Sequence, residues 1–282
     1  MDISVIADTF DAWTDNVLGW ISDNGDWLFD PLRTALEGTY NGVLWLLQLP
    51  PFYVIAIVGA VLGWRLINAV SGLLAGLALL FCAVMGLWSE TMGTLALVAT
   101  ATIFALMVGI PVGIVAGFVQ WFDRFLEPIL DLIQTLPPYI YLLPAIALLG
   151  FGPATALIAT FIVAMPPAIR LTSLGIRMTP PAFIELGQAS GLTPWQMFMK
   201  IRLPFAIPSV MAGINQSLMM AFGMVVIAGI VGSGGLGETI YSAVRTLDMA
   251  TSINAAIAIV ILTMVLDRLT QNSARRAKRE AR

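Results

Sequence analysis

Long apolar runs alternate with short polar segments along most of this chain. A membrane-spanning helix needs about 20 mostly apolar residues, and seven runs approach that length: 52–69, 71–88, 92–118, 138–151, 153–170, 207–232 and 249–267. Only Gly150 to Pro153 separate the fourth run from the fifth, which predicts a tight turn between two helices, with one long broken helix as the alternative. The pattern therefore predicts an all-α, polytopic membrane helix bundle of about seven spans.

Composition supports the membrane class and argues against an enzyme. Hydrophobic residues make up 59% of the chain and charged residues 11%, whereas an average soluble chain has about 25% charged residues. The chain has no histidine, so it lacks the usual general base near neutral pH and the commonest metal ligand. An intramembrane enzyme would need a nucleophile, a base or a metal cluster at depth, and the predicted spans contain none. We therefore expect no catalytic residue and no metal site.

The placement of lysine and arginine predicts the orientation, because basic residues collect on the cytoplasmic side. The tail from Arg268 to Arg282 carries six basic residues and should be cytoplasmic. Counting back through the runs, the loops 171–206 and 119–137 also fall on the cytoplasmic side. Residues 1–50 hold seven Asp and one Glu against one Arg and should lie outside. The expected parts are an outer arm at 1–50, a transmembrane domain at 51–270 and a basic tail at 271–282.

Residues 31–49 differ from the acidic stretch before them. Asp30 and Pro31 are suited to start a helix, with Asp as the N-cap and Pro in the first turn. Apolar residues then recur at helical spacing up to Leu47, and Trp45 lies nearby. This pattern predicts an amphipathic helix in the outer membrane interface, with a helix packed onto the bundle as the alternative.

A polar, punctuated stretch, ELGQASGLTPWQMFMKIRLP, occupies residues 185–204 between two apolar runs. Thr179 is a possible N-cap for a first short helix, and Gly191 is a natural left-handed stop for it. Thr193 repeats the start signal before Pro194, and the second helix should end before Pro204. We call residues 180–204 the paired-helix segment; its alternative interpretation is an ordinary connection packed under the bundle.

The spacing of residues in this segment resembles the signature loop of ATP-binding-cassette importer permeases. That family's pattern is Glu-Ala-Ala, three residues, Gly, nine residues and Ile-x-Leu-Pro, and Glu185, Gly191 and the stretch 201–204 match it in register. The sequence departs from the pattern at Leu186 and Gly187, where the family usually has alanine. The resemblance implies a type I ABC importer permease fold, and a coupling loop at 171–206 that docks into a cleft of an ATPase subunit.

The residues that this resemblance implies for ATPase coupling are Glu185, Leu186, Gly187, Ala189, Gly191, Lys200, Ile201, Leu203 and Pro204. Glu185 offers a hydrogen-bond acceptor to the ATPase, and the small residues let another backbone approach closely. ATP and Mg would be bound by the partner ATPase and no cofactor by this chain, which has no Walker lysine motif.

Further stretches resemble the glycine betaine/proline (quaternary ammonium) uptake permeases over roughly 86–271. They lie at 134–137, 215–218, 224–228, 247–249 and 266–271. The resemblance implies import of glycine betaine, proline betaine or choline, with trimethylamine N-oxide or carnitine as alternatives. It also implies a homodimer in the lipid of the bacterial inner membrane, two cytoplasmic ATP-binding subunits, a periplasmic substrate-binding protein and no nucleic acid. An ATP-independent osmotic channel is the rival class, but such a channel has no use for a docking segment.

Polar residues near the predicted spans are candidates for the substrate pathway, because polar side chains at membrane depth usually face a cavity or another helix. Two tyrosines among them offer aromatic faces to a quaternary ammonium group. Contacts between helices and anchoring at the membrane interface are the alternatives. The candidates are Gln134, Thr135, Tyr139, Tyr141, Asn215, Gln216 and Ser217.

The stretch 232–237 matches the dinucleotide-binding pattern G-x-G-x-x-G. A dinucleotide site also requires a preceding strand, a following helix and an acidic residue about 20 positions on. Here the motif follows an apolar run that ends on the outer side. We therefore expect a loop rather than a nucleotide site.

Overall fold

The computed structural model describes residues 3–280, and no strand occurs in that range. The elements are α1 (Ile3–Gln48), α2 (Phe52–Leu66), α3 (Ala69–Val84), α4 (Trp88–Phe118), α5 (Gln120–Thr135), η1 (Pro138–Tyr141), α6 (Leu142–Leu149), α7 (Pro153–Arg177), α8 (Pro181–Ala189), α9 (Pro194–Met197), η2 (Phe198–Arg202), α10 (Leu203–Ala228), η3 (Gly229–Val231), α11 (Gly235–Arg245) and α12 (Met249–Glu280). The all-α prediction is confirmed.

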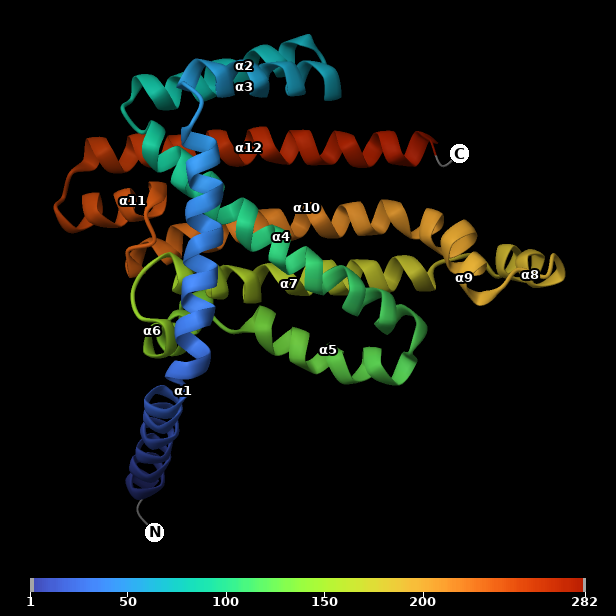
Figure 1. The fold of residues 1–282 in the computed structure, drawn as a ribbon, viewed down its shortest axis with the longest axis horizontal. Helices are drawn as coiled ribbons and strands as arrows, with labels where there is room; N and C mark the ends of the chain where they lie inside the picture. Colours follow the sequence, from blue (N-terminus) through green and yellow to red (C-terminus); the bar gives the residue numbers. More distant parts are fainter. Residues whose placement is uncertain (1–2, 281–282) are drawn as a thin grey trace.

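The longer helices run roughly along one axis of the molecule, and α1 crosses them (Figure 1). Helix α7 packs against both α4 and α10, α10 packs against α12, and α2 pairs with α3. Helices α8 and α9 lie at the same end as the C-terminus of α12, which we call the paired-helix end (Figure 1). Helices α1, α6 and α11 lie toward the opposite end, which we call the arm end. The N-terminal helix α1 and the C-terminal end of α12 thus lie at opposite ends of the bundle.

A line of glycines brings α4 and α7 together. Gly109, Gly113 and Gly117 recur every four residues and therefore lie on one face of α4. A Cβ added at Gly113 would lie 2.6 Å from the carbonyl oxygen of Ile169, and one added at Gly117 would lie 2.7 Å from Cβ of Ile176. Small residues at such positions let two membrane helices approach to backbone contact. Packing at the centre of the bundle therefore depends on glycines, which have no side chain, as well as on apolar side chains.

The segment 119–137, predicted as a cytoplasmic loop, is instead largely the helix α5 and lies against α4 and α7. Two of its charged residues pair with α7: Asp123 Oδ2 lies 2.5 Å from a guanidinium nitrogen of Arg177, and Asp131 Oδ1 lies 2.5 Å from one of Arg170. Ser173 also donates a hydrogen bond to Asp123, at 2.8 Å. A search for apolar runs misses such a helix because its charges, two of which are neutralised by a neighbour, lower its mean hydropathy.

The predicted span at 138–151 is also corrected. It forms η1 and the eight-residue helix α6, which at about 1.5 Å per residue is far too short to cross a membrane. Helix α5 and the following stretch Pro138–Leu149 instead form one helix pair, with a bend of 104° between the two parts. Within residues 3–280, four helices are long and apolar enough to cross a membrane, or up to six if each of two bent pairs forms one span. The turn predicted between the fourth and fifth runs is confirmed, with Gly150 and Gly152 at positive φ.

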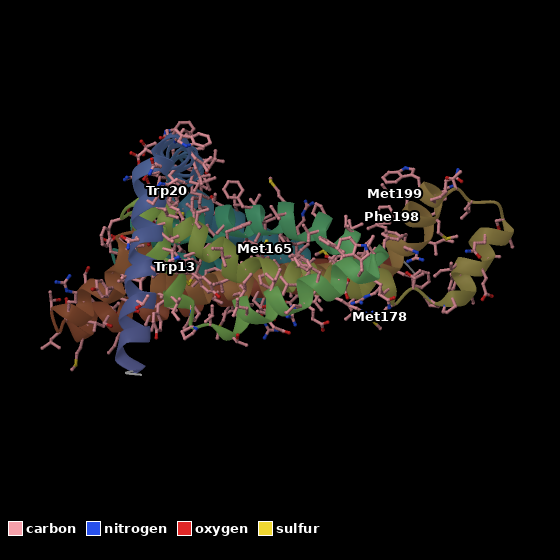
Figure 2. All side chains as sticks on the ribbon, turned by 90° about the horizontal axis from the view of Figure 1, so that it is seen from below. Trp13, Trp20, Met165, Met178, Phe198 and Met199 are labelled. Atoms are coloured by element: carbon pink, nitrogen blue, oxygen red, sulfur yellow. The ribbon has the colours of Figure 1, made fainter. Side chains whose placement is uncertain are left out.

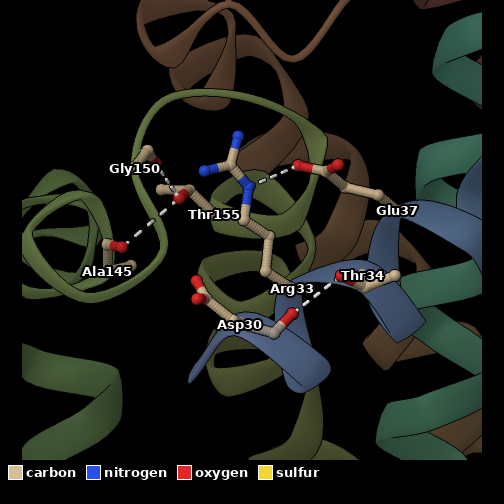
Figure 3. Close-up of polar contacts among 7 residues, drawn as sticks. All are labelled: Asp30, Arg33, Thr34, Glu37, Ala145, Gly150 and Thr155. Carbon is tan, nitrogen blue, oxygen red and sulfur yellow. Dashed lines mark hydrogen bonds and ion pairs between the residues drawn. The ribbon is translucent and has the colours of Figure 1, made fainter. Parts of the chain in front are cut away.

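The N-terminal arm is one helix, α1, and not a loose stretch followed by a helix. Pro31 lies inside α1, so the helix start predicted at Asp30 is wrong. Leu36 and Tyr40 are buried against the bundle. Figure 3 shows Arg33 and Glu37 of α1 beside the α6–α7 turn, and a Cβ added at Gly150 would lie 3.2 Å from the Arg33 guanidinium. The second half of α1 therefore packs on the bundle, while its axis makes an angle of 91° with α2.

Candidate functional site: the paired-helix segment

The glycine corner predicted in the paired-helix segment is present. Helix α8 ends at Ala189, and Gly191 follows with φ at +70°. The N–H of Gly191 donates to the Gln188 carbonyl and that of Leu192 to the Gly187 carbonyl, both at 3.0 Å. These two hydrogen bonds make a Schellman motif, which needs a left-handed residue at this position. Nothing lies within 4 Å of a Cβ added at Gly191, so the corner is open.

The second helix begins as its sequence indicates. The Thr193 hydroxyl accepts a hydrogen bond from the Gln196 N–H at 3.3 Å, and the Gln196 side chain accepts one from the Thr193 N–H at 3.0 Å. This reciprocal capping box satisfies two amides that a helix start leaves unpaired. The first helix differs from expectation: its N-cap is Pro180, and the Thr179 hydroxyl donates to the Ile176 carbonyl at the end of α7.

The second helix does not end before Pro204, as the sequence pattern predicted. Residues Phe198–Arg202 form a π-helical turn that leads directly into α10. Proline has no N–H and its ring clashes with the carbonyl four residues earlier. A wider π turn changes the hydrogen-bond register just before Pro204, and such turns are frequent at functional sites. The segment is therefore continuous with α10, a membrane-spanning candidate.

Gly187 is buried inside the paired-helix segment, where it lets two helical turns pack closely, and it does not lie on the surface. A Cβ added there would lie 2.6 Å from Cε of Met197 and 2.8 Å from Cδ1 of Ile201. Helix α8 thus folds back onto α9 and the π turn at this point. Glu185 and Leu186 are exposed beside it, and so are Ala189 and Lys200, whereas Ile201, Leu203 and Pro204 are partly buried. Two helices held at a fixed angle present these exposed residues as one rigid surface.

Aromatic side chains join the segment to the end of α4. The Trp195 and Phe198 ring centroids lie 5.7 Å apart, and those of Phe198 and Phe118 lie 5.8 Å apart in an edge-on arrangement. The Arg202 guanidinium lies 4.9 Å from the Phe118 ring centroid. Figure 2 shows Phe198 and Met199 at the end of the molecule opposite Trp13 and Trp20. The sequence pattern did not predict this cluster, because Phe118 is 80 residues from Phe198.

The candidate pathway residues do not gather at one place. Gln134 and Thr135 are exposed at the end of α5, and Tyr139 is exposed on η1. The Tyr141 hydroxyl donates to the Ile133 carbonyl at 2.8 Å. The four residues at 134–141 therefore lie near one another.

Asn215 makes hydrogen bonds to a neighbouring helix. Its amide donates to Asp267 Oδ1 at 3.1 Å, and the Thr270 hydroxyl donates to its Oδ1 at 2.5 Å. These bonds tie α10 to α12. Of its neighbours, Gln216 is exposed and Ser217 is fully buried. Gln216 is therefore the most exposed of these three residues.

A cavity of about 580 Å³ lies at the arm end, between α1, the whole length of α11 and the starts of α4 and α12. Glu90, Glu238 and Asp248 line it, and Glu238 accepts a hydrogen bond from the Gly234 N–H at 2.7 Å. Hydrogen bonds from the hydroxyl and the N–H of Thr251 hold the pKa of Asp248 below its usual value. The sequence analysis missed this site because its residues come from four separate segments.

The glycine motif at 232–237 forms a tight connection between helices. Gly232, Gly234 and Gly235 have positive φ, and a Cβ added at Gly237 would lie 2.3 Å from the Val225 carbonyl oxygen. The motif follows α10 and η3, so the strand that a dinucleotide site requires is missing within the described residues.

A bundle of apolar helices with a rigid paired-helix surface at one end defines a membrane transport permease. The chain belongs to the family of binding-protein-dependent transport system inner membrane components, whose model matches residues 109–279. The glycine betaine transport system permease protein OpuAB of Bacillus subtilis is 40% identical over 95% of this chain and 93% of that protein. The glycine betaine/proline betaine transport system permease protein ProW of Escherichia coli is 37% identical, over 93% of this chain and 74% of that protein.

Relatives named for other solutes also match. They include a glycine betaine/carnitine permease of Listeria monocytogenes at 36% identity, over 94% of this chain and 89% of that protein, and a trimethylamine N-oxide permease of Pelagibacter ubique at 34%, over 78% of this chain and 31% of that protein. Among solved structures, an inward-facing MetNI methionine ABC transporter matches with 25% identity and a TM-score of 0.58, over 68% of this chain and 94% of that chain. The predicted type I ABC importer permease fold is thereby confirmed.

Proposed function

We propose that this chain is the membrane permease subunit of an ATP-driven importer for glycine betaine or a closely similar quaternary ammonium compound, such as proline betaine or choline. The observation that carries the proposal is the similarity to two glycine betaine permeases along nearly the whole chain. Carnitine and trimethylamine N-oxide remain the alternative solutes, because relatives named for them also match.

The proposed assembly contains two copies of this chain, two cytoplasmic ATP-binding subunits and a periplasmic substrate-binding protein. ATP and Mg are bound by the ATP-binding subunits, and this chain binds no cofactor. The N-terminus is periplasmic and the C-terminus is cytoplasmic, in the bacterial inner membrane. The positions of α1 and of the paired-helix segment at opposite ends of the bundle support this orientation.

In this proposal the paired-helix segment is the contact with the ATPase. Closure of two ATPase subunits is a rigid-body motion, and a rigid surface transmits such a motion better than a flexible loop. The Schellman corner at Gly191 and the capping box at Thr193 fix the angle between α8 and α9. The π turn then connects them without a break to α10. Exposed Glu185 and Leu186 are placed to meet the ATPase.

Reconstituted uptake tests the proposal. The permease, its ATPase and its binding protein are placed in proteoliposomes with internal or external ATP, and uptake of radiolabelled glycine betaine, choline, carnitine and trimethylamine N-oxide is measured. We expect accumulation of glycine betaine that requires both ATP and the binding protein. An ATPase with its Walker lysine replaced is the control and should give no accumulation. Solute flux that persists with this control ATPase would favour the channel.

A further inference from the structure

Three tryptophans form a line along the first part of α1. Trp13, Trp20 and Trp27 follow one another at seven-residue intervals, and their side chains are 60%, 68% and 77% exposed. Seven residues are close to two helical turns, with a drift of about 20° per interval. The three rings therefore lie on one face of the helix, and all three are exposed.

Two exposed carboxylates of this stretch, Asp11 and Asp26, lie on another face. At about 100° per residue, Asp11 and Asp26 fall a quarter turn or more from the tryptophan line, and both are exposed. The first 32 residues contain seven Asp and no Lys or Arg. Residues 3–30 thus form a helix whose tryptophan face differs from the face that carries Asp11 and Asp26.

The direction of α1 places both faces relative to the membrane. The part of α1 from Asn24 onward makes an angle of 91° with α2. In Figures 1 and 2 the rest of α1 also crosses the axis of the long helices and stays near the arm end. A helix that crosses spanning helices near one end of them lies in the plane of the membrane surface. Rings on one face of such a helix all reach the same depth.

We propose that residues 3–30 lie on the membrane with Trp13, Trp20 and Trp27 inserted among the lipid headgroups and the aspartates in water. Tryptophan is enriched at the membrane–water interface because its ring is large and apolar and carries one N–H donor. This lipid contact does not depend on which solute is carried. The orientation of the chain in the membrane decides only which leaflet the helix contacts.

The charge of this helix specifies the kind of lipid. Interfacial amphipathic helices commonly use Lys and Arg to bind anionic lipids. Residues 3–30 carry only negative charges, so anionic headgroups repel them and zwitterionic headgroups do not. Because salt screens the repulsion, the contact with an anionic membrane should strengthen as ionic strength rises.

Labelling of the full-length protein in vesicles tests the proposal. Cys82, which is buried, is replaced by serine, and an environment-sensitive fluorophore is attached in one variant at Trp20→Cys and in a matched control at Asp26→Cys. In phosphatidylcholine vesicles, we expect the label at position 20 to be blue-shifted and quenched by lipids spin-labelled near the headgroup. Acrylamide, a neutral quencher in water, should quench it several-fold less than the label at position 26.

Lipid composition and partners provide the other arms of the experiment. In vesicles of phosphatidylglycerol at low salt the two labels should be quenched alike by acrylamide, and the difference should return as salt is added. Equal quenching in phosphatidylcholine overturns the proposal. Protection of position 20 only after the binding protein is added would overturn it in favour of a protein contact. Spin–spin broadening between labels at position 20 would overturn it in favour of a second copy of the chain.

Discussion

The Arg202 guanidinium lies 4.9 Å from the centroid of the Phe118 ring, so the start of α10 and the end of α4 are held together beside the paired-helix segment. Phe198 of the π turn meets the same ring. A movement of the segment therefore reaches α4 and α10 together. A cation–π contact of this kind contributes about 0.5–2 kcal/mol.

The first prediction concerns this contact. Arg202→Gln and Phe118→Leu should each lower ATP-dependent uptake by roughly two- to thirtyfold, because the loss of about 0.5–2 kcal/mol weakens the link between ATPase and helices. ATP hydrolysis by the assembled complex should fall less than uptake. Arg202→Lys keeps a cation and should retain part of the uptake. Equal losses of hydrolysis and uptake, or a fully additive double variant, would contradict the interpretation.

The second prediction concerns the glycine corner. Gly191→Val should sharply reduce uptake, since a β-branched residue at positive φ costs at least about 1–2 kcal/mol. Gly191→Asn is the matched control, because asparagine tolerates this conformation, and it should keep most of the uptake. No neighbouring atom lies near the new side chain, so the difference reports backbone conformation alone. Co-purification of the ATPase with each variant should follow the same order.

The third prediction concerns the glycine line of α4. Gly113→Val should lower the stability of the protein by about 1–3 kcal/mol, because its Cβ has to displace the α7 backbone at Ile169. Gly223→Ala in α10, where nothing lies within 4 Å, is the control and should leave stability unchanged or raise it. Thermal unfolding in detergent measures both. An unaltered unfolding temperature for Gly113→Val would show that α4 and α7 have room to separate.

The fourth prediction separates two neighbouring polar residues. Asn215→Leu removes the hydrogen bonds to Asp267 and Thr270, so it should lower the unfolding temperature without changing the relative uptake of different solutes. Thr270→Val should act in the same direction and more weakly. Gln216→Ala should have the opposite pattern: the unfolding temperature should stay the same and the KM for uptake should change. A change in solute preference in Asn215→Leu would instead indicate that Asn215 lines the substrate pathway.

Features set by neighbouring residues were predictable from the sequence. The capping box at Thr193 and the left-handed Gly191 depend on residues within three or four positions, and both are present. The apolar runs likewise located α4, α7, α10 and α12, because burial in lipid requires nearly every residue of a span to be apolar.

Features that depend on distant residues were not predictable in this way. Helix α5 looked like a loop because it carries charges, two of which are compensated by Arg170 and Arg177 of α7, 39 and 54 positions further along the chain. The regular spacing of Gly109, Gly113 and Gly117 was a usable signal for close helix packing. The π turn at Phe198–Arg202 has no local sequence rule, and it allows the helix to continue where Pro204 suggested an end.

The glycine line also limits how this protein changes shape. The close contact of these glycines with α7 leaves little room for α4 to slide past α7, so we expect these two helices to move as one stiff lever. The hinges of any transport cycle then lie outside this pair, and a small tilt of the lever at the paired-helix end is magnified at the arm end. Sites far from the ATPase can therefore open widely although the joint beside it moves very little.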